Sequence, residues 1–388
     1  MDKGLSIKVT DQNGRVWPTQ KPQGLVIKNT ENGYAEANWS YDRSFQAYYS
    51  DLASFANVRI DNSSWIYNTT GTQWQGWLVG PTSELQGGIE RVSAQALGYW
   101  ATLNFLKRPS SLATGTPESQ IALLFSGGYL PHLLNDTTGL AVTGVASNIF
   151  NTNNGTTFEF VADIVRDLCN RGTSTGLRVV PSVWENRKLV TTILPATPAP
   201  RYKVDVKWVE SMTLHRSLLT VYNRVSVLYK NNVGTTVFIN VDDTTTPSSQ
   251  TRYGFNYGAG AVPFIRQYVA DITSMGNMPS AVQPTDYANQ YLAKYARLRN
   301  IATNAITLKP GALVMDTVLG RTMPLFAVRA GTYFQIQGLY PRPTSGGTGT
   351  QAGDGGTDKY FYVSATEYNH DSGKLALSPE VKTDLSNQ

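Results

Sequence analysis

Short runs of alternating hydrophobic and polar residues fill the first hundred positions, and this period of two is typical of half-buried β-strands. The run from Leu5 to Thr10 leads into an Asn-Gly turn, which tolerates positive φ. The segment Asn68 to Gly71 separates two further runs as a hairpin turn would. The other runs are Trp39 to Phe45, Asn57 to Ile60, Trp65 to Tyr67, Gln73 to Val79 and Arg91 to Leu97. Short strands at this spacing favour a barrel or a sandwich.

The hydrophobic period changes after Pro109 and predicts two helices. Thr116-Pro117-Glu118 supplies a hydroxyl N-cap, a proline at the first helical position and an acid in the first turn, and Gly127-Gly128 ends the helix. A second helix is expected from about Thr157 to Asn170. A strand pair, Leu177 to Val183 and Lys188 to Ile193, and a proline-rich linker from Pro195 to Pro200 follow it.

The strand pattern returns from Tyr202. Val221 to Tyr229 alternates strongly and is expected to pair with Val237 to Val241 across a turn at 231–234. One long helix is predicted from Thr285 to about Ile301. The last predicted strands are Ala305 to Leu308, Tyr333 to Gln337, Tyr360 to Thr366 and Lys374 to Leu377. The Gly/Thr-rich stretch Thr344 to Thr357 has too few apolar side chains to offset its ordering entropy, so a mobile loop is expected there.

Composition narrows the class of protein. Hydrophobic residues are 41% of 388, which is enough for packed cores, and charged residues are only 16%. The net charge of +5 comes from scattered Lys and Arg residues, so no nucleic-acid patch is predicted. Cys169 is the single cysteine and is expected to be a buried thiol on a helix. We expect no signal peptide and no membrane span, because no apolar run reaches about 18 residues.

Motifs for catalysis, cofactors and metals are missing from the sequence. The histidines His132, His215 and His370 are far apart, and no metal-ligand spacing, nucleophile elbow, P-loop or dinucleotide fingerprint occurs. We therefore predict no enzyme, no cofactor and no metal site. The glycine-rich segment around Asp354 and Asp358 is expected to be a solvated loop rather than a calcium site.

A carbohydrate-active protein is the alternative that the residues leave open. Glu84 and Glu90, or the adjacent Asp242-Asp243, could supply the two carboxylates of a glycosidase. A cluster of exposed aromatic side chains could stack on sugars, and Trp65, Trp74 and Trp77 are close in sequence. Adjacent acids at a strand end more often cap a turn, and tryptophans more often pack in a core.

Two ordered sets of short motifs resemble the tail-tip (baseplate) hub proteins of long-tailed bacteriophages. The first set is Val16-Trp17, Glu36-Ala37-Asn38-Trp39, Trp74-x-Gly76-x-Leu78-Val79 and Gly98-Tyr99-Trp100. The second set is Asn223-Arg224-Val225-x-Val227-x-Tyr229, Asp242-Asp243, Arg252-Tyr253-Gly254, Leu308-Lys309-Pro310-Gly311, Tyr360-Phe361-Tyr362-Val363 and Leu377-Ser378-Pro379-Glu380. Candidate assembly or structural residues taken from these motifs are Trp39, Trp77, Asn223, Arg224, Val227, Tyr253 and Gly254.

The resemblance implies a mainly β fold, with two β-barrel-like tube domains per subunit and an α+β middle domain. The expected boundaries are 1–108 for the first barrel, 201–246 with 305–388 for the second, and 109–200 with 247–304 for the middle domain. A homotrimer would turn these six barrels into a pseudo-sixfold ring. The implied partners are the distal tail or tube ring protein, the tape measure protein and tail fibre or receptor-binding proteins.

The function implied is structural. Such a hub would close or extend the tail tube, convert sixfold to threefold symmetry, link the tail to host-contacting proteins and let DNA pass without sequence-specific binding. The expected location is the virion tail tip, after assembly in the host cytoplasm. A distal tail ring protein is a further alternative.

Overall fold

The computed structural model describes most of the chain. The described residues are 4–16, 23–44, 55–62, 72–86, 89–109, 116–140, 158–170, 177–195, 199–215, 221–244, 248–252, 254–256, 261–273, 277–278, 280–296, 301–302, 305–338 and 360–379. The expected strand Trp65 to Tyr67, the expected loop Thr344 to Thr357 and residues 196–198 of the expected linker lie outside them.

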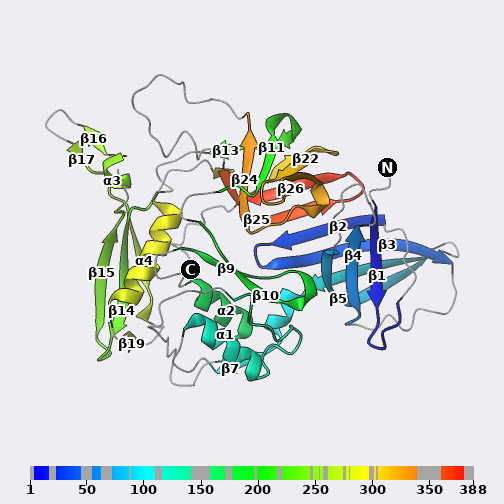
Figure 1. Ribbon diagram of the computed structural model, residues 1–388, viewed down its shortest axis with the longest axis horizontal. Coiled ribbons are helices and arrows are strands. Elements are labelled where there is room, and N and C mark those ends of the chain that lie inside the picture. Colours follow the sequence, from blue (N-terminus) through cyan, green and yellow to red (C-terminus); the bar gives the residue numbers. More distant parts are fainter. Residues whose placement is uncertain are drawn as a thin grey trace.

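One large sheet runs through both ends of the chain (Figure 1). Its first half has the strand order β1-β4-β5-β6-β3-β2, with every neighbouring pair antiparallel. These strands are β1 (Leu5–Thr10), β2 (Gln23–Thr30), β3 (Gly33–Ser44), β4 (Asn57–Asn62), β5 (Thr72–Gln86) and β6 (Ile89–Gly98). Alternate residues of β6 are buried from Glu90 to Gly98, so the period of two in the sequence matches a sheet with one buried face.

The second half of the sheet continues in the order β25-β24-β11-β22-β23, and β26, β21 and β12 extend it from β25. These strands are β11 (Tyr202–Asp205), β12 (Val209–Ser211), β21 (Ile306–Leu308), β22 (Leu313–Asp316), β23 (Arg321–Pro324), β24 (Thr332–Gln337), β25 (Tyr360–Asn369) and β26 (Lys374–Pro379). The protein is therefore mainly β, as the sequence predicts.

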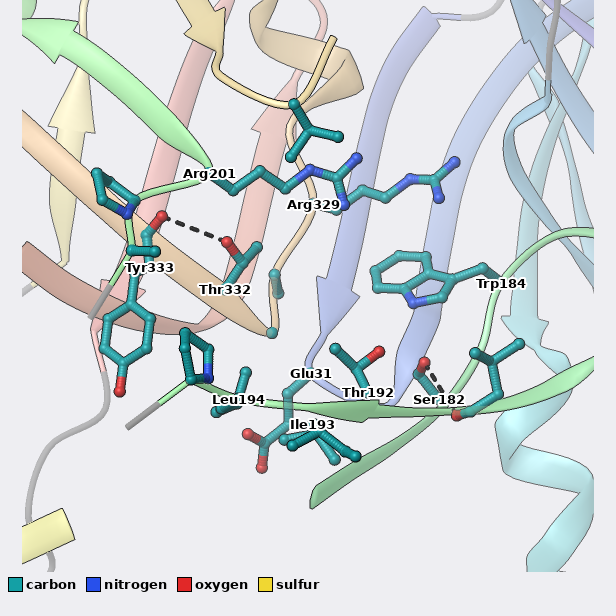
Figure 2. Close-up of a pocket in the computed structure, with 18 of the residues that line it drawn as sticks. Glu31, Ser182, Trp184, Thr192, Ile193, Leu194, Arg201, Arg329, Thr332 and Tyr333 are labelled. Atoms are coloured by element: carbon teal, nitrogen blue, oxygen red, sulfur yellow. Dashed lines mark hydrogen bonds between the residues drawn. The ribbon is translucent and has the colours of Figure 1, made fainter. Parts of the chain in front are cut away.

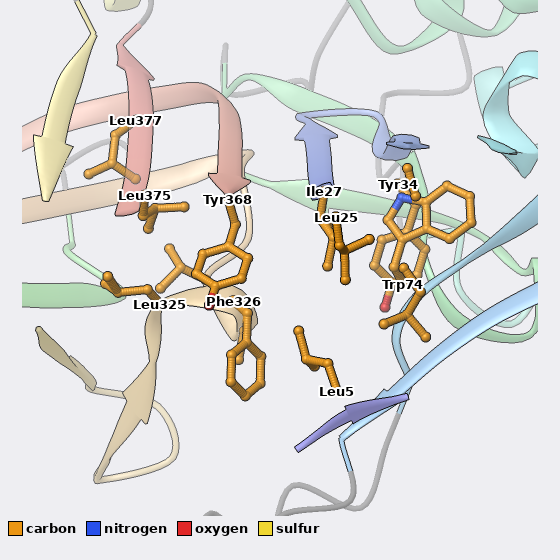
Figure 3. Close-up of a cluster of buried hydrophobic side chains, with 14 of the residues drawn as sticks. Leu5, Leu25, Ile27, Tyr34, Trp74, Leu325, Phe326, Tyr368, Leu375 and Leu377 are labelled. Carbon is orange, nitrogen blue, oxygen red and sulfur yellow. The ribbon is translucent and has the colours of Figure 1, made fainter. Parts of the chain in front are cut away.

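The two halves of the sheet share one hydrophobic core. Figure 3 shows Leu5, Leu25 and Trp74 of the first half on one side of this core and residues of the second half on the other. The second half contributes Leu325, Phe326, Tyr368, Leu375 and Leu377. Burial of this apolar surface is the main force that holds the halves together.

A mixed layer lies beside the first half (Figure 1). Its elements are β7 (Lys107–Pro109), α1 (Pro117–Ser126), β8 (Phe158–Phe160), α2 (Val161–Asn170), β9 (Val179–Val183) and β10 (Leu189–Ile193). The hairpin β9–β10 packs one face on the helices, where Val179, Val183 and Leu189 join a second core. Cys169 is buried in that core, as the sequence predicts.

A small sheet with its own core stands at the far side of the molecule (Figure 1). Its strand order is β15-β14-β18, with β19 also paired to β14, and helix α4 covers one face. The bounds are β14 (Arg224–Asn231), β15 (Thr236–Asp242), β18 (Gln267–Asp271), β19 (Asn277–Met278) and α4 (Val282–Tyr295). Short elements complete the description: β13 (Leu214–His215) with β20 (Ile301–Ala302), α3 (Ser249–Arg252), and β16 (Phe255–Asn256) with β17 (Ala261–Val262).

The small sheet changes the domain picture expected from the sequence. The sequence predicts the range 201–246 in the second barrel, but of the described strands in that range only β11 and β12 lie in the large sheet. The strands β14 and β15 lie in the small sheet because β18 pairs with β14 and α4 supplies their hydrophobic cover. The helical ranges 109–200 and 247–304 likewise contribute to two separate cores.

The helix predictions differ from the structure mainly at the ends. Helix α1 begins and ends as expected, and the Thr116 hydroxyl accepts the Ser119 N–H at 3.1 Å. Helix α2 starts later than expected, because Phe158–Phe160 pairs with β7 as a strand. Helix α4 begins at Val282, and Ile301 lies in strand β20.

Candidate functional site

The junction between the two halves of the large sheet is a regular antiparallel ladder. Strand β2 pairs with β25 from Val26 opposite Asn369 to Thr30 opposite Ala365. Backbone bonds extend the ladder at both ends, from Glu31 N–H to the Ser364 carbonyl and from His370 N–H to the Leu25 carbonyl. Two segments more than 300 residues apart in the sequence thus pair edge to edge.

The described part of the large sheet has two terminal strands on its main path. Among the described strands, β1 pairs with β4 and β23 pairs with β22; the last residue of β1, Thr10, also forms one isolated bridge with Val16. The inward side chains Leu5 and Ile7 of β1 are buried, whereas Lys8 is exposed. On this path, one terminal strand belongs to the first half and the other to the second; the side branches of the sheet end at β12 and β10.

A cleft of about 670 Å³ separates the β9–β10 hairpin from the second half of the sheet (Figure 2). The hairpin residues Val180, Ser182, Val190 and Thr192 line one wall. These residues alternate with Val179, Val183 and Leu189, so the hairpin has one face on the helical core and the other on the cleft. The opposite wall comes from the β22–β23 turn and the segment that enters β24, Thr317, Val318 and Arg329 to Tyr333.

Ion pairs tie the walls of the cleft together. Arg329 binds Glu185 and lies over the Trp184 ring at 5.0 Å, and Figure 2 shows its side chain reaching across toward the hairpin. Arg178 binds Glu31 at 2.7 Å, and that carboxylate also accepts the Tyr362 hydroxyl at 2.6 Å. These partly exposed pairs fix the hairpin against the large sheet more than they create a charged binding site.

The cleft contains no arrangement typical of catalysis among its described residues. The Ser182 hydroxyl donates to the Val190 carbonyl at 3.5 Å. The described residues that line the cleft include no histidine. Across the described part of the chain, no group of three or more His, Cys, Asp and Glu residues could hold a metal ion. In the same part, no helix has the length and apolar character to cross a membrane.

The predicted residues Asn223 and Arg224 lie at the start of β14 in a structural network. The Asn223 amide donates to the Phe264 carbonyl at 2.6 Å and its oxygen accepts the Arg266 N–H at 2.9 Å. Arg224 forms two bonds with the Asp242 carboxylate, at 2.6 and 2.9 Å. The hydrogen bond from Arg224 is the largest influence that lowers the pKa of Asp242.

The acids of the glycosidase alternative are not arranged as a pair in a cleft. Asp243 accepts the Ser249 N–H at 2.8 Å, so it caps the turn into α3, and Asp242 is bonded to Arg224 and Gln250. Glu84 is exposed on β5, whereas Glu90 is buried on β6. Neither glutamate lines the cleft in Figure 2.

The other predicted residues are mostly parts of the packed interior. Trp39 lies in the core of the large sheet, Val227 is fully buried under α4, and Trp77 packs in the mixed layer against Phe55 at 4.4 Å between ring centroids. A Cβ at Gly254 would lie 2.7 Å from the Val262 carbonyl oxygen, so glycine permits this contact. Tyr253 lies outside the described residues.

Burial prevents two of the three tryptophans considered for sugar binding from stacking on a sugar ring. Trp74 is fully buried and Trp77 is 6% exposed, so neither ring offers an open face. Trp65 lies outside the described residues. The cleft residues Arg329, Glu185 and Glu31 were not predicted, because each belongs to a different segment and only long-range pairing brings them together.

Comparison with solved structures assigns the fold. The tail protein from Neisseria meningitidis MC58 matches with a TM-score of 0.59 at 11% identity, over 98% of this chain and 97% of that chain. The 43 kDa tail protein of prophage MuSo2 from Shewanella oneidensis matches with a TM-score of 0.55 at 12% identity, over 96% of each chain. Prophage tail protein gp18 from Listeria monocytogenes EGD-e matches with a TM-score of 0.53 at 12% identity, over 98% and 96%.

These matches are structural, since no family model and no curated protein sequence matches this chain. They cover nearly the full length of both partners in each comparison, so the likeness extends to the whole arrangement of large sheet, mixed layer and small sheet. The resemblance drawn from the short motifs is therefore confirmed at the level of the fold: this chain has the fold of prophage tail proteins.

Proposed function

We propose that this protein is the hub at the tip of a phage tail, a non-catalytic trimer whose subunits form a ring around the tail axis. Each subunit contributes two curled sheet halves, so three copies place six such halves in the ring. The hub joins the tail tube, through its ring and tape measure proteins, to fibres or receptor-binding proteins that contact the host. DNA passes through the ring without sequence-specific contacts.

The β2–β25 ladder is the observation that carries this proposal. Within one chain it already joins the edge of one half to the edge of the next half by main-chain hydrogen bonds. A ring needs the same kind of contact between chains, and the terminal strands β1 and β23 offer one edge from each half. Closing the ring would satisfy the backbone groups at both edges.

We propose the domain division that follows from this arrangement. The two halves of the large sheet form the ring, and the mixed layer with β9–β10 supports it from one side. The small sheet with α4 forms a separate peripheral unit, since its core is its own. This unit then stands away from the ring and is available for other tail proteins.

Crosslinking between engineered cysteines tests the contact between chains. Lys8 of β1 and Thr322 of β23 are both exposed, whereas the native Cys169 is buried. The double variant Lys8→Cys with Thr322→Cys, treated with a short bifunctional maleimide, is expected to give covalent dimers and then trimers. Each single variant serves as a control and gives no covalent trimer.

The possible outcomes separate the candidate functions. Trimers that do not crosslink in the double variant would mean that subunits meet at other surfaces. A hexamer would identify a distal tail ring protein instead. A monomer that hydrolyses cell-wall or capsular polysaccharide, and loses that activity in Glu84→Gln, Glu90→Gln or Asp243→Asn, would establish the carbohydrate-active alternative.

A further inference from the structure

The outer edge of β15 has backbone groups that no described strand pairs with. The Asn231 N–H binds the Thr235 carbonyl and the Asp243 N–H binds the Asn223 carbonyl, which fixes the alternation of the ladder between β14 and β15. The backbone groups of Thr236, Phe238 and Asn240 therefore point away from β14. Strand β15 is the outermost strand of the small sheet, and in the described part of the chain no strand pairs with this edge (Figure 1).

This edge lacks the features by which proteins usually protect free strands. Proline, lysine, a bulge or an inward charge would each discourage a second strand from pairing. The sequence of β15, Thr-Val-Phe-Ile-Asn-Val-Asp, contains no proline or lysine, and its pairing with β14 runs without a shift in register. Its one charge, on Asp242, is bound by Arg224.

Burial around β15 is incomplete in a way that an added strand would correct. The residues of β14 beneath α4, such as Val225 and Val227, are fully buried. Their neighbours Val237 and Ile239 on β15 pack against the same core but remain half-buried. On the opposite face, Phe238 is 66% exposed. A strand at the free edge would cover all three side chains while it paired with the backbone.

If subunits meet through the large sheet as proposed, the position of β15 favours a different polypeptide over a second copy of this chain as the occupant of this edge. The small sheet lies on the far side of the molecule from β1, β4 and β5 (Figure 1), and the ring of the proposed function is built from the large sheet. Copies that meet through β1 and β23 leave β15 at the periphery. The edge is uncharged apart from the paired Asp242, so it fits a neutral, apolar strand.

We propose that an extended, neutral strand of another tail protein adds to the free edge of β15. The main-chain bonds would come from Thr236, Phe238 and Asn240, and alternate side chains of the incoming strand would cover Phe238 on one face and Ile239 on the other. This inference rests on the proposed function, because the ring decides which surfaces of the chain remain open.

Hydrogen exchange of single backbone amides tests the proposal, and β15 supplies its own control. In the isolated full-length protein the amides of Thr236, Phe238 and Asn240 are expected to exchange rapidly, while those of Val237 and Ile239 are slow because they bind β14. In purified intact tails the three outward amides are expected to slow by about 100-fold or more. Outward amides that remain fast in the tails would overturn the proposal.

Other outcomes identify other occupants and also overturn it. Outward amides that are already slow in the dilute isolated protein would mean that this chain covers its own edge. Protection that appears only as the isolated protein is concentrated would mean that a second copy is the occupant. The mass of the isolated protein is measured in the same samples, so a failed trimer is distinguished from an unoccupied edge.

A proline variant separates strand pairing from simple apolar contact. Phe238→Pro removes an outward N–H that the subunit itself does not use, so trimers of unchanged mass should form while tails lack the added strand. Phe238→Ala keeps the N–H and should reduce tail assembly less. Normal tails with protected Thr236 and Asn240 amides in Phe238→Pro would contradict the proposal, provided that both variants unfold at the midpoint of the parent.

Discussion

At the scale of single residues, close packing of backbones explains two glycines of the motifs that carry the resemblance. Gly76 and Gly98, from two of the four N-terminal motifs, lie opposite each other in the β5–β6 ladder. A Cβ on Gly98 would lie 1.7 Å from the Tyr34 carbonyl oxygen, and one on Gly76 would lie 2.1 Å from the Leu97 oxygen. Both contacts are with backbone, which cannot rotate away as a side chain can.

Substitution of Gly98 is therefore expected to be severe. Gly98→Ala would force β3 away from β6 and should lower the free energy of unfolding by about 3 kcal/mol or more. Gly80→Ala in the same strand pair is the matched control, since nothing lies within 4 Å of its Cβ position, and it should change stability by less than about 0.5 kcal/mol. Urea unfolding of both variants tests this. Equal stability of the two would refute the packing explanation.

Because of Tyr34, the folded protein is expected to lose stability at alkaline pH. Burial is the main reason why its pKa is raised to about 12 from an ordinary value near 10. The unfolded chain therefore ionises first, so the stability from the neutral, buried phenol is complete below pH 10 and is lost as the pH rises toward 12. Urea midpoints from pH 8 to 11.5 should fall less steeply in Tyr34→Phe than in the parent. Identical slopes would contradict a buried, neutral Tyr34.

At the scale of elements, turns and caps were predictable because their signals are local. The Thr116 cap of α1 and the turn between β14 and β15 both lie within a few residues of the segments they end or join. Partners in a sheet are not local. Nothing in the segment Val221 to Tyr229 indicates that β18 rather than a barrel strand lies beside it, and nothing near Val26 indicates Asn369.

A buried carboxylate, that of Asp316, holds the turn between β22 and β23. Asp316 is fully buried, accepts the N–H groups of Val318 and Leu319 at 2.9 and 3.0 Å, and is approached by the Arg201 guanidinium at 3.3 Å. The turn forms part of one wall of the cleft, so Asp316 links the cleft to the edge strand β23.

Loss of this carboxylate should therefore cost more than loss of an exposed one. Asp316→Ala removes a buried carboxylate that accepts two part-buried N–H groups and the Arg201 guanidinium, and is expected to lower the free energy of unfolding by about 2 kcal/mol. Asp11→Ala is the control: Asp11 accepts the N–H groups of Asn13 and Arg15 at 2.8 and 2.9 Å, but these bonds are exposed and water can replace them. Its cost should be below about 1 kcal/mol. Thermal unfolding of both proteins checks the difference, which should vanish if burial is irrelevant here.

At the scale of the whole molecule, one continuous sheet joins two halves of a chain, with a supporting layer on one side and a separate small sheet beyond it. The sequence predicted the mainly β class and the two β-rich ends, because strand periodicity and the order of the motifs extend over the whole chain. It did not predict the separate small sheet, because the strands beneath α4 have the same sequence pattern as the strands expected in the barrels.

The mass of the purified full-length protein in solution tests the central claim most directly. Sedimentation equilibrium over a wide concentration range, supported by native mass spectrometry, measures it without assumptions about shape. The account predicts a trimer, with three times the subunit mass of 42.5 kDa, that persists on dilution. In that trimer the backbone amides at the edges β1 and β23 of the large sheet should be protected from hydrogen exchange. A stable monomer at high concentration, with both of those edges exchanging freely, would contradict it.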